Sequence, residues 1–279
     1  MRQTKKRMIL DGHIHTRDGE ADRKAFVRKM AEAGVGGGAV TSLPPPSFKS
    51  YAGSAPPAER LDKLFWWCEA DAELYPMYWL DPIEDDAVQQ VELAVKRGVA
   101  GFKIICDRFP PGDKRAMKAY RAIARAGKPI LFHSGILWDG KASSMFNRPA
   151  EFECLIEVEG LRFCLAHISW PWCDEVIAVY GKFLVARRRR SELSVEMFID
   201  ITPGTPPIYR REALTKLFTI GYELKGNVVF GSDSAANDYS TNSVQQWLER
   251  DGKIFEELAL PPETIEGIYG ANLRRFLGV

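Results

Sequence analysis

The sequence predicts an α/β fold, a (β/α)8 (TIM) barrel with a C-terminal helical extension. The chain has 279 residues, 46% of them hydrophobic, which is enough to bury a large core. Short apolar runs alternate with stretches of helical periodicity, and eight units of roughly 30 residues approach the ~250 residues of such a barrel. Successive strands are then parallel, because strand–helix–strand crossovers are right-handed. A doubly wound open sheet is the alternative.

Each expected strand is an apolar run that stops abruptly at polar, glycine or proline residues. This pattern is typical of strands that are covered on both faces. The eight runs are residues 8–15, 35–42, 74–81, 99–105, 129–133, 161–167, 195–201 and 227–233.

The segments between these runs carry apolar residues at helical spacing, and several close with a glycine. The clearest helices are expected at residues 21–34, 57–73, 84–98, 114–127 and 211–226. Residues 241–279 then supply a last helix and a helical cap, which we expect to pack outside the barrel. Residues 1–279 are therefore interpreted as one domain.

Composition limits the partners of the protein. The 38 basic and 37 acidic residues nearly cancel, which argues against a nucleic-acid binder and favours a small-molecule substrate.

Five cysteines without a C-x-x-C pair indicate reduced thiols. The apolar stretch after Lys5, Lys6 and Arg7 is too short for a signal peptide or a membrane anchor. We expect a cytoplasmic protein, and the sequence leaves open whether its outer helices pair two copies as a homodimer.

Metal-capable side chains gather at the ends of the expected strands. All four histidines of the chain lie at such ends, together with one aspartate and, near the end of the fourth strand, one lysine. These residues are His13, His15, Lys103, His133, His167 and Asp233. Because the carboxyl ends of all strands in this barrel meet at one mouth, we expect the six side chains to converge.

Strand parity predicts how the first strand is oriented. His13 and His15 share a face, about 6.6 Å apart along the strand, so both can reach one ion. If they point inward, Asp11 points inward as well, whereas Leu10 and Ile14 meet the helices. Asp11 is then a buried carboxylate that needs a hydrogen-bonding partner.

Imidazole nitrogens and a carboxylate form a ligand set that suits zinc and neighbouring divalent metals. A site with fewer than four protein ligands leaves a position for water. Zinc lowers the pKa of such a water to about 7, and a nearby carboxylate can take its proton.

Several segments together resemble the amidohydrolase superfamily. They are DGHIH at 11–15, FHSG at 132–135, LAHIS at 165–169, FGSDS at 230–234 and GANLRRF at 270–276. The set is most similar to the amidohydrolase-related branch, which also contains the aminocarboxymuconate-semialdehyde decarboxylase-like lyases.

The resemblance implies a role for each matched residue. His13, His15, His133 and Asp233 would bind a divalent metal, with zinc the expected ion. His167 would lie beside the metal and polarise the substrate or shuttle a proton. Asp233 would also act as the general base.

The resemblance allows two roles for Lys103. In binuclear members a carboxylated lysine at this strand bridges two metals, and His133 and His167 would then hold the second ion. In mononuclear members Lys103 would bind an anionic group of the substrate, and the branch favours this case, with one metal per chain. An ion pair with Asp107 is a third, purely structural interpretation.

Residues just past the strand ends are candidate substrate contacts, namely Arg108, Trp138 and Trp170. Cys164 falls on the outward phase of its strand and is expected to be a small core residue.

We predict a metal-dependent hydrolase that uses an activated water to attack an amide, lactone or ester carbonyl. The alternative is a metal-dependent decarboxylase or hydratase on the same ligands, which would require strong carboxylate binding by arginine or lysine at the mouth. A deoxyribonuclease of the same superfamily is disfavoured by Lys103 and the balanced charge. A barrel that only binds a ligand is disfavoured because every ligand type is present.

Overall fold

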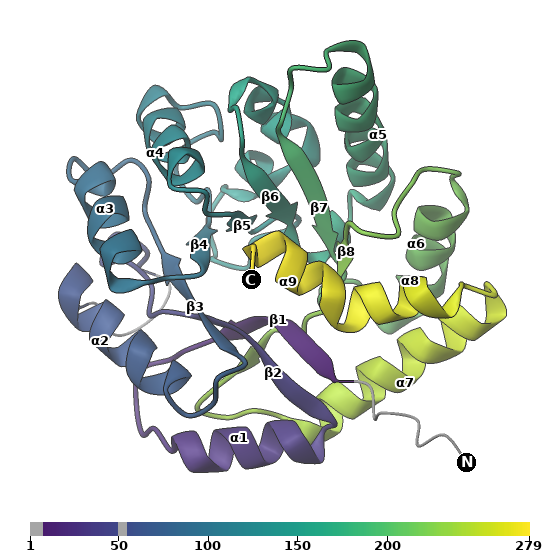
Figure 1. The fold of residues 1–279 in the computed structure, drawn as a ribbon, viewed down its shortest axis with the longest axis horizontal. Helices are drawn as coiled ribbons and strands as arrows, with labels where there is room; N and C mark the ends of the chain where they lie inside the picture. The colour runs from purple at the N-terminus through teal and green to yellow at the C-terminus, as the bar shows by residue number, and fades with distance from the viewer. Residues whose placement is uncertain (1–7, 50–54) are drawn as a thin grey trace.

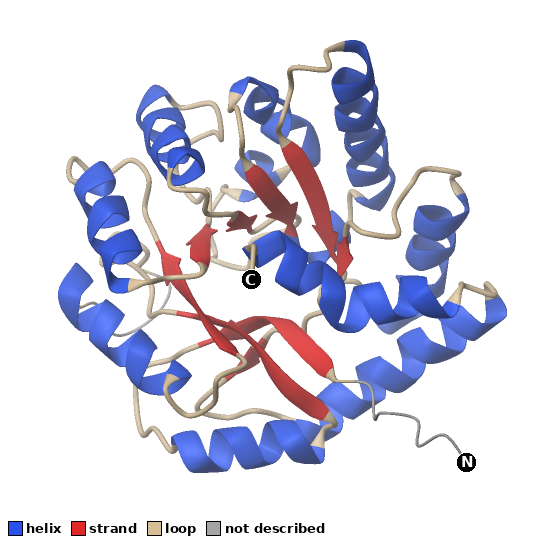
Figure 2. Cartoon of the chain, in the orientation of Figure 1, coloured by secondary structure: helices blue, strands red, loops and turns tan. Residues whose placement is uncertain are grey.

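A parallel sheet curls around one axis, and helices cover its outer face (Figures 1 and 2). The computed structural model describes residues 8–49 and 55–279, so the basic residues Lys5 to Arg7 lie outside the described part. The strands are β1 (Ile9–His15), β2 (Val35–Thr41), β3 (Leu74–Trp79), β4 (Gly101–Ile104), β5 (Ile130–Phe132), β6 (Arg162–Leu165), β7 (Glu196–Asp200), β8 (Val228–Val229) and β9 (Ser234–Ala235). The eight predicted strand positions are confirmed.

The sheet closes on itself. Its order is β8-β7-β6-β5-β4-β3-β2-β1-β9, and β8 and β9 are two parts of one short segment of chain. Between them, Gly12 N donates to Phe230 O at 2.9 Å and Asp233 N donates to His13 O at 2.9 Å. This segment therefore fills the eighth position between β7 and β1, which makes the fold a barrel and rules out the open doubly wound sheet.

Helices follow the strands around the barrel. The α-helices are α1 (Arg23–Glu32), α2 (Pro57–Cys68), α3 (Ala87–Arg97), α4 (Lys114–Arg125), α5 (Cys173–Arg189), α6 (Pro207–Thr219), α7 (Thr241–Glu257), α8 (Pro262–Glu266) and α9 (Asn272–Leu277). Short 3-10 segments η1 (Ser144–Asn147), η2 (Pro149–Glu157) and η3 (Ala166–Ser169) lie around β6, and a π-helical turn η4 (Gly267–Ala271) precedes α9.

Local chemistry explains where these helices begin and end. Asp22 caps α1 by accepting hydrogen bonds from Lys24 N and Ala25 N. Gly98 ends α3 in the left-handed conformation, as predicted. The expected helix at 211–226 was placed wrongly: α6 begins earlier and ends at Thr219, because Gly221 adopts a φ of +85° and turns the chain away.

Two large apolar clusters fill the space between the barrel and the helices and the interior of the barrel. The larger one lies between the barrel and the helices and includes Ile14 of β1 and Phe26 of α1. The smaller one fills the barrel interior and includes Leu10 together with Leu273 and Phe276 of α9. The C-terminal cap therefore does not simply pack outside the barrel as expected. It lies across the barrel (Figure 1) and closes its amino-terminal end with apolar side chains.

A β-bulge in β1 overturns the predicted parity of that strand. Between Asp11 and Ile14 the strand takes three steps while β2 takes two, from Gly38 to Val40. The extra residue lets both Leu10 and His13 point into the barrel, so the prediction that Leu10 meets the helices is wrong. Cys164 was also misassigned, since it belongs to the inner cluster rather than to the outer face of its strand.

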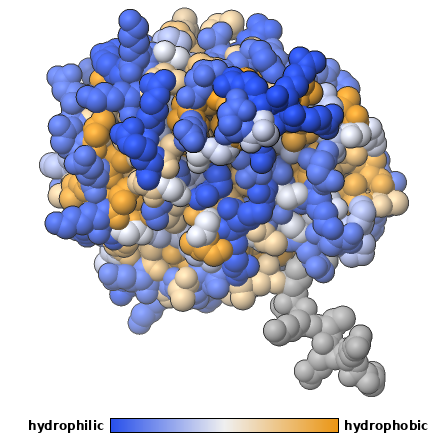
Figure 3. Space-filling model, turned by 45° about the horizontal axis from the view of Figure 1, so that its top comes forward, coloured by the Kyte–Doolittle hydropathy of each residue, from blue (hydrophilic) through white to orange (hydrophobic). Residues whose placement is uncertain are grey.

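On the face drawn in Figure 3, hydrophilic residues cover most of the surface and hydrophobic ones are interspersed among them. Within residues 8–49 and 55–279, none of the helices combines the length and apolar character needed to cross a bilayer. The five cysteines are free thiols.

Candidate active site

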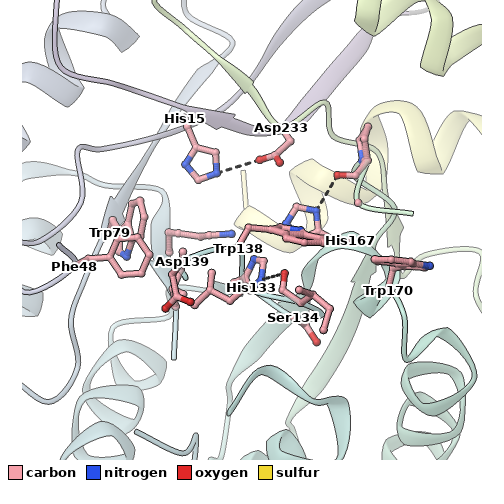
Figure 4. Close-up of a pocket in the computed structure, with 16 residues that line it drawn as sticks. His15, Phe48, Trp79, His133, Ser134, Trp138, Asp139, His167, Trp170 and Asp233 are labelled. Atoms are coloured by element: carbon pink, nitrogen blue, oxygen red, sulfur yellow. Dashed lines mark hydrogen bonds and ion pairs between the residues drawn. The ribbon is translucent and has the colours of Figure 1, made fainter. Parts of the chain in front are cut away.

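A pocket of about 370 Å³ lies at the carboxyl ends of the strands (Figure 4). Its lining residues include His15, Phe48, Trp79, Lys103, His133, Trp138, Asp139, His167, Trp170 and Asp233. The predicted convergence of strand-end residues at one mouth is thus seen for side chains from β1, β4, β5, β6 and the β8–β9 segment.

Three of the predicted metal ligands point their donor atoms at one another. His13 Nε2 lies 3.1 Å from His15 Nε2. Asp233 Oδ1 lies 3.3 Å from His15 Nε2 and 3.7 Å from His13 Nε2. In the described part of the chain, these residues form a group whose donor atoms all lie within 4.8 Å of one another, as a metal site requires.

The backbone around Asp233 is specialised for this geometry. Asp233 has a φ of +59°, an uncommon conformation for a residue with a side chain. Nearby, a Cβ on Gly231 would lie only 2.6 Å from His13 Cβ and would also meet Thr202 Oγ1. Glycine at this position therefore allows the β8–β9 segment to pass close to the His13 side chain.

The Asp11 side chain connects the bulge in β1 to the β8–β9 segment by hydrogen bonds. Its buried carboxylate accepts hydrogen bonds from Ser232 N at 2.8 Å, Tyr239 Oη at 2.9 Å and His13 N at 3.1 Å. Burial raises the pKa of Asp11 to about 6, although these hydrogen bonds act in the opposite direction. These contacts are the partners that the sequence could not identify.

Burial favours the neutral imidazole at His13, His15 and His133. It lowers the pKa of His13 and His133 well below the usual value, and the positive charge of Lys103 adds to the effect at both. Burial also lowers the pKa of His15. Neutral imidazoles offer the lone pairs that a metal needs.

Asp233, in contrast, is held in its charged form despite its burial. Burial alone would raise its pKa, but the hydrogen bond with His15 and the nearby imidazoles of His167 and His13 outweigh it and lower the pKa strongly. The group at neutral pH is therefore two neutral rings facing an ionised carboxylate.

Lys103 lies inside the barrel and contacts the group directly. Its side chain is fully buried, and its Nζ lies 3.0 Å from His13 Nε2. Burial lowers the pKa of Lys103 to about 8, despite the nearby charges of Asp233 and Asp200. The proposed ion pair with Asp107 is not what the structure shows, because Asp107 pairs with Arg108 and Lys141.

His133 and His167 each have one ring nitrogen tied to a backbone carbonyl. His133 Nε2 lies 3.2 Å from Ile136 O, and His167 Nδ1 lies 3.1 Å from Pro203 O. A nitrogen facing a carbonyl must carry a proton, so Nδ1 of the neutral His133 ring remains as an acceptor, whereas His167 donates through Nδ1 and its Nε2 takes no part in this contact. The two rings are 5.0 Å apart, but His133 lies outside the three-residue donor group, and its role as a ligand stays a prediction.

An unusual turn presents His167. Three consecutive residues with side chains, His167, Ile168 and Ser169, have positive φ. Such strained backbone persists only where the surroundings impose it. Here Ser134 Oγ donates to Ser169 Oγ at 2.7 Å, and Gly204 provides room, since a Cβ there would lie 2.8 Å from His167 Cβ.

The predicted substrate contacts separate into two kinds. Trp138, which is 83% exposed, and Trp170 both line the pocket. Arg108 does not, because its guanidinium pairs with the buried carboxylates of Asp81 and Asp107.

Sequence reasoning missed several residues of the site, among them two aromatic side chains and an aspartate. Phe48 and Trp79 pack with ring centroids 5.0 Å apart and line the pocket. Asp200 ends β7 and lies 2.7 Å from His13 Nδ1. The signal for Asp200 was available, since an aspartate closes an apolar run in the same way as Asp233.

A comparison with protein-family models gives a match over most of the chain. The model of the amidohydrolase family matches residues 60–279. The matched segment includes Lys103, His133, His167 and Asp233 but not His13, whose place in the site follows from the structure. Comparison with curated protein sequences gives no significant match.

Solved structures share the fold along the whole chain. A probable 2-pyrone-4,6-dicarboxylic acid hydrolase from Acinetobacter baumannii has a TM-score of 0.62 at 12% identity, covering 97% of this chain and 99% of that one. A 2,6-dihydroxybenzoate decarboxylase from Rhizobium has a TM-score of 0.64 at 11% identity, covering 98% of both chains. A dihydroorotase from Campylobacter jejuni has a TM-score of 0.58 at 14% identity, covering 98% of this chain and 83% of that one. At such identities the likeness concerns the fold alone.

Proposed function

Because this chain belongs to the amidohydrolase family, we propose that it is a metal-dependent hydrolase that cleaves an amide, lactone or ester bond of a small organic substrate. One observation carries the proposal. Two neutral imidazoles and an ionised carboxylate, from His13, His15 and Asp233, converge beside a pocket large enough for a small molecule.

The residues present fit a divalent metal. Their donors are two imidazole nitrogens and one carboxylate oxygen, a combination that zinc accepts in catalytic sites. A metal held there would supply two effects, since it lowers the pKa of water and polarises a carbonyl. His133 is the candidate fourth ligand, through the Nδ1 that its hydrogen bond leaves free.

Two residues would move the protons of the reaction. The Asp233 carboxylate, whose pKa is strongly lowered, is ionised at neutral pH and would take a proton from the attacking water. His167 donates its Nδ1–H to Pro203 O, so its Nε2 is the atom that would face the substrate. From there it would receive or return a proton as the leaving group departs.

The charge of the pocket favours hydrolysis of an uncharged substrate over decarboxylation. Among the described lining residues Lys103 is the basic one, and its Nζ is engaged by His13. Arg108 is held outside by two carboxylates. A decarboxylase on these ligands is expected to hold the carboxylate of its substrate with an arginine or lysine at the mouth, whereas the aromatic side chains Phe48, Trp79 and Trp138 suit an apolar or planar group.

A substrate panel tests the reaction type. The purified, zinc-loaded protein is assayed on p-nitrophenyl acetate, small lactones, N-acyl anilides and 2-pyrone-4,6-dicarboxylate in H2 18O, and on 2,6-dihydroxybenzoate with CO2 detection. The proposal expects one 18O atom in the product of an ester, lactone or amide. Release of CO2 without incorporation of solvent oxygen would instead assign a lyase.

The number of ions tests the role of Lys103. We propose one zinc per chain, with Lys103 close to the substrate, so Lys103→Ala should keep the wild-type metal content. A fall from about two equivalents to one in this variant would indicate a carboxylated lysine that bridges two ions.

A further inference from the structure

One buried carboxylate near the pocket has no part in the reaction described above. Asp200 ends β7, and its Oδ2 lies 2.7 Å from His13 Nδ1. The two side chains are 2% and 0% exposed, so water cannot replace either partner. When this carboxylate is ionised it only accepts hydrogen bonds, and Nδ1 of His13 then carries the ring proton.

A second contact indicates the same tautomer. On the other side of the ring, Lys103 Nζ lies 3.0 Å from His13 Nε2. A lysine ammonium only donates, so Nε2 accepts and holds the lone pair. This is the nitrogen that lies 3.1 Å from His15 Nε2 and 3.7 Å from Asp233 Oδ1.

Asp200 is itself held in place. Its Oδ1 accepts a hydrogen bond of 2.6 Å from Thr202 N and a second one from the Thr202 hydroxyl. Gly231 leaves the space for that hydroxyl, because a Cβ at this position would collide with Thr202 Oγ1. With Oδ1 occupied in this way, Oδ2 is left to face His13.

We propose that Asp200 is a positioning residue for the metal site, which fixes the orientation and the tautomer of His13 so that Nε2 can ligate a divalent ion. The inference rests on the proposed function, since it concerns the same metal. A histidine without such a partner spends part of its time with a proton on Nε2, and in that form Nε2 has no lone pair to offer a metal. Loss of an outer carboxylate partner typically weakens metal affinity about 10- to 100-fold.

Asp200→Asn tests this role at nearly constant volume. An asparagine can donate its amide to His13 Nδ1 and thereby allow the Nε2–H tautomer. Metal-stripped, full-length protein is titrated with Co2+ and followed by visible absorbance, and Zn2+ affinity is measured by competition with a chelator. We expect binding about 10- to 100-fold weaker than in the wild type.

Asp251→Asn is the matched control. Asp251 is also fully buried and pairs with a cation, Arg210, at 2.6 Å, but it contacts none of the histidines. This variant should lose thermal stability and keep wild-type affinity for Co2+ and Zn2+. Equal weakening in both variants would overturn the proposal, because the loss would then reflect a general loosening of the barrel.

The tautomer of His13 can be observed without metal. The chain has four histidines, so 15N spectra of the imidazoles are simple, and His13→Gln identifies the His13 signals. We expect a protonated Nδ1 in the metal-free wild type and a mixture of tautomers in Asp200→Asn. Wild-type metal affinity and an unchanged tautomer in Asp200→Asn would overturn the inference. A wild type that binds no metal but shows the Nδ1–H form would refute the proposed function and leave the Asp200–His13 role supported.

Discussion

The two ends of the barrel interior are built from the same strands and have opposite chemistry. At the amino end Leu10 meets Leu273 and Phe276 in a purely apolar cluster. At the carboxyl end His13 and Lys103 are buried as deeply as those side chains, but they are polar and titratable. Stability and chemistry are therefore located at opposite ends of one barrel.

The energetic consequences of burial differ in sign between the two ends. A fully buried apolar side chain at the amino end contributes about 1.5–3 kcal/mol. At the carboxyl end burial disfavours the charged forms, as the lowered pKa values of Lys103 and His13 show. We therefore expect changes at the carboxyl end to remove activity and changes at the amino end to remove stability.

The largest effect is expected from the donor group. His13→Ala or Asp233→Asn should lower turnover at least about 100-fold, because each removes a metal ligand, and Asp233→Asn also removes the proposed base. Turnover is measured on whichever panel substrate the wild type converts, and circular dichroism should show an intact fold. Full activity in either variant would refute the mechanism.

The amino end should respond to Phe276→Ala. Phe276 is 2% exposed and packs against Phe198 with ring centroids 5.1 Å apart, so the truncation should lower the free energy of unfolding by about 3–5 kcal/mol. Urea denaturation measures the loss, and the metal content of the folded protein should not change. Val279→Ala, at an exposed position, is the control and should shift stability by less than about 0.5 kcal/mol. Loss of metal in Phe276→Ala would remove the distinction between the two ends.

Lys103→Met should make the metal-free protein more stable at pH 7. The folded pKa of Lys103, about 8, lies below its ordinary value of 10.5, so between these values the unfolded chain binds more protons than the folded one. The stability of the wild type relative to the variant therefore rises with pH across this window. The advantage of the variant should be up to about 3 kcal/mol at pH 7 and should disappear above about pH 10.5. Urea denaturation across this pH range measures it, and a difference that is independent of pH would contradict the assignment.

The mildest effect is expected at the pocket mouth. Trp138 is 83% exposed, so Trp138→Ala should leave the free energy of unfolding within about 0.5 kcal/mol of wild type. Loss of its contact with the substrate should raise KM about fivefold, equivalent to about 1 kcal/mol, with little change in kcat. Arg108→Gln tests the other predicted contact, and an unchanged KM would show that Arg108 serves only its two ion pairs.

The sequence predicted the barrel and the histidines, the lysine and Asp233 that gather at its mouth. Apolar runs that end at His15, His133, His167 and Asp233 indicate buried parallel strands, and parallel strands bring their carboxyl ends together whatever the details of packing. The order of the elements was therefore predictable from periodicity alone.

Orientation within a strand was harder to predict. Counting alternate residues failed for Leu10 because one extra residue in the bulge reverses the parity. Counting failed again for Cys164, because the strand ends at Leu165 and the backbone enters the left-handed region at His167. Partners such as Tyr239 for Asp11 depend on contacts between distant segments, which no local pattern contains.

The central claim is that His13 and its neighbours at the carboxyl end of the barrel hold a divalent metal. The most direct test is elemental analysis by mass spectrometry of purified, unchelated wild type and His13→Ala, both expressed with ample metal. We predict about one equivalent of zinc per chain in the wild type and far less in the variant. A wild type without metal, or a variant that retains the full amount, would contradict the account.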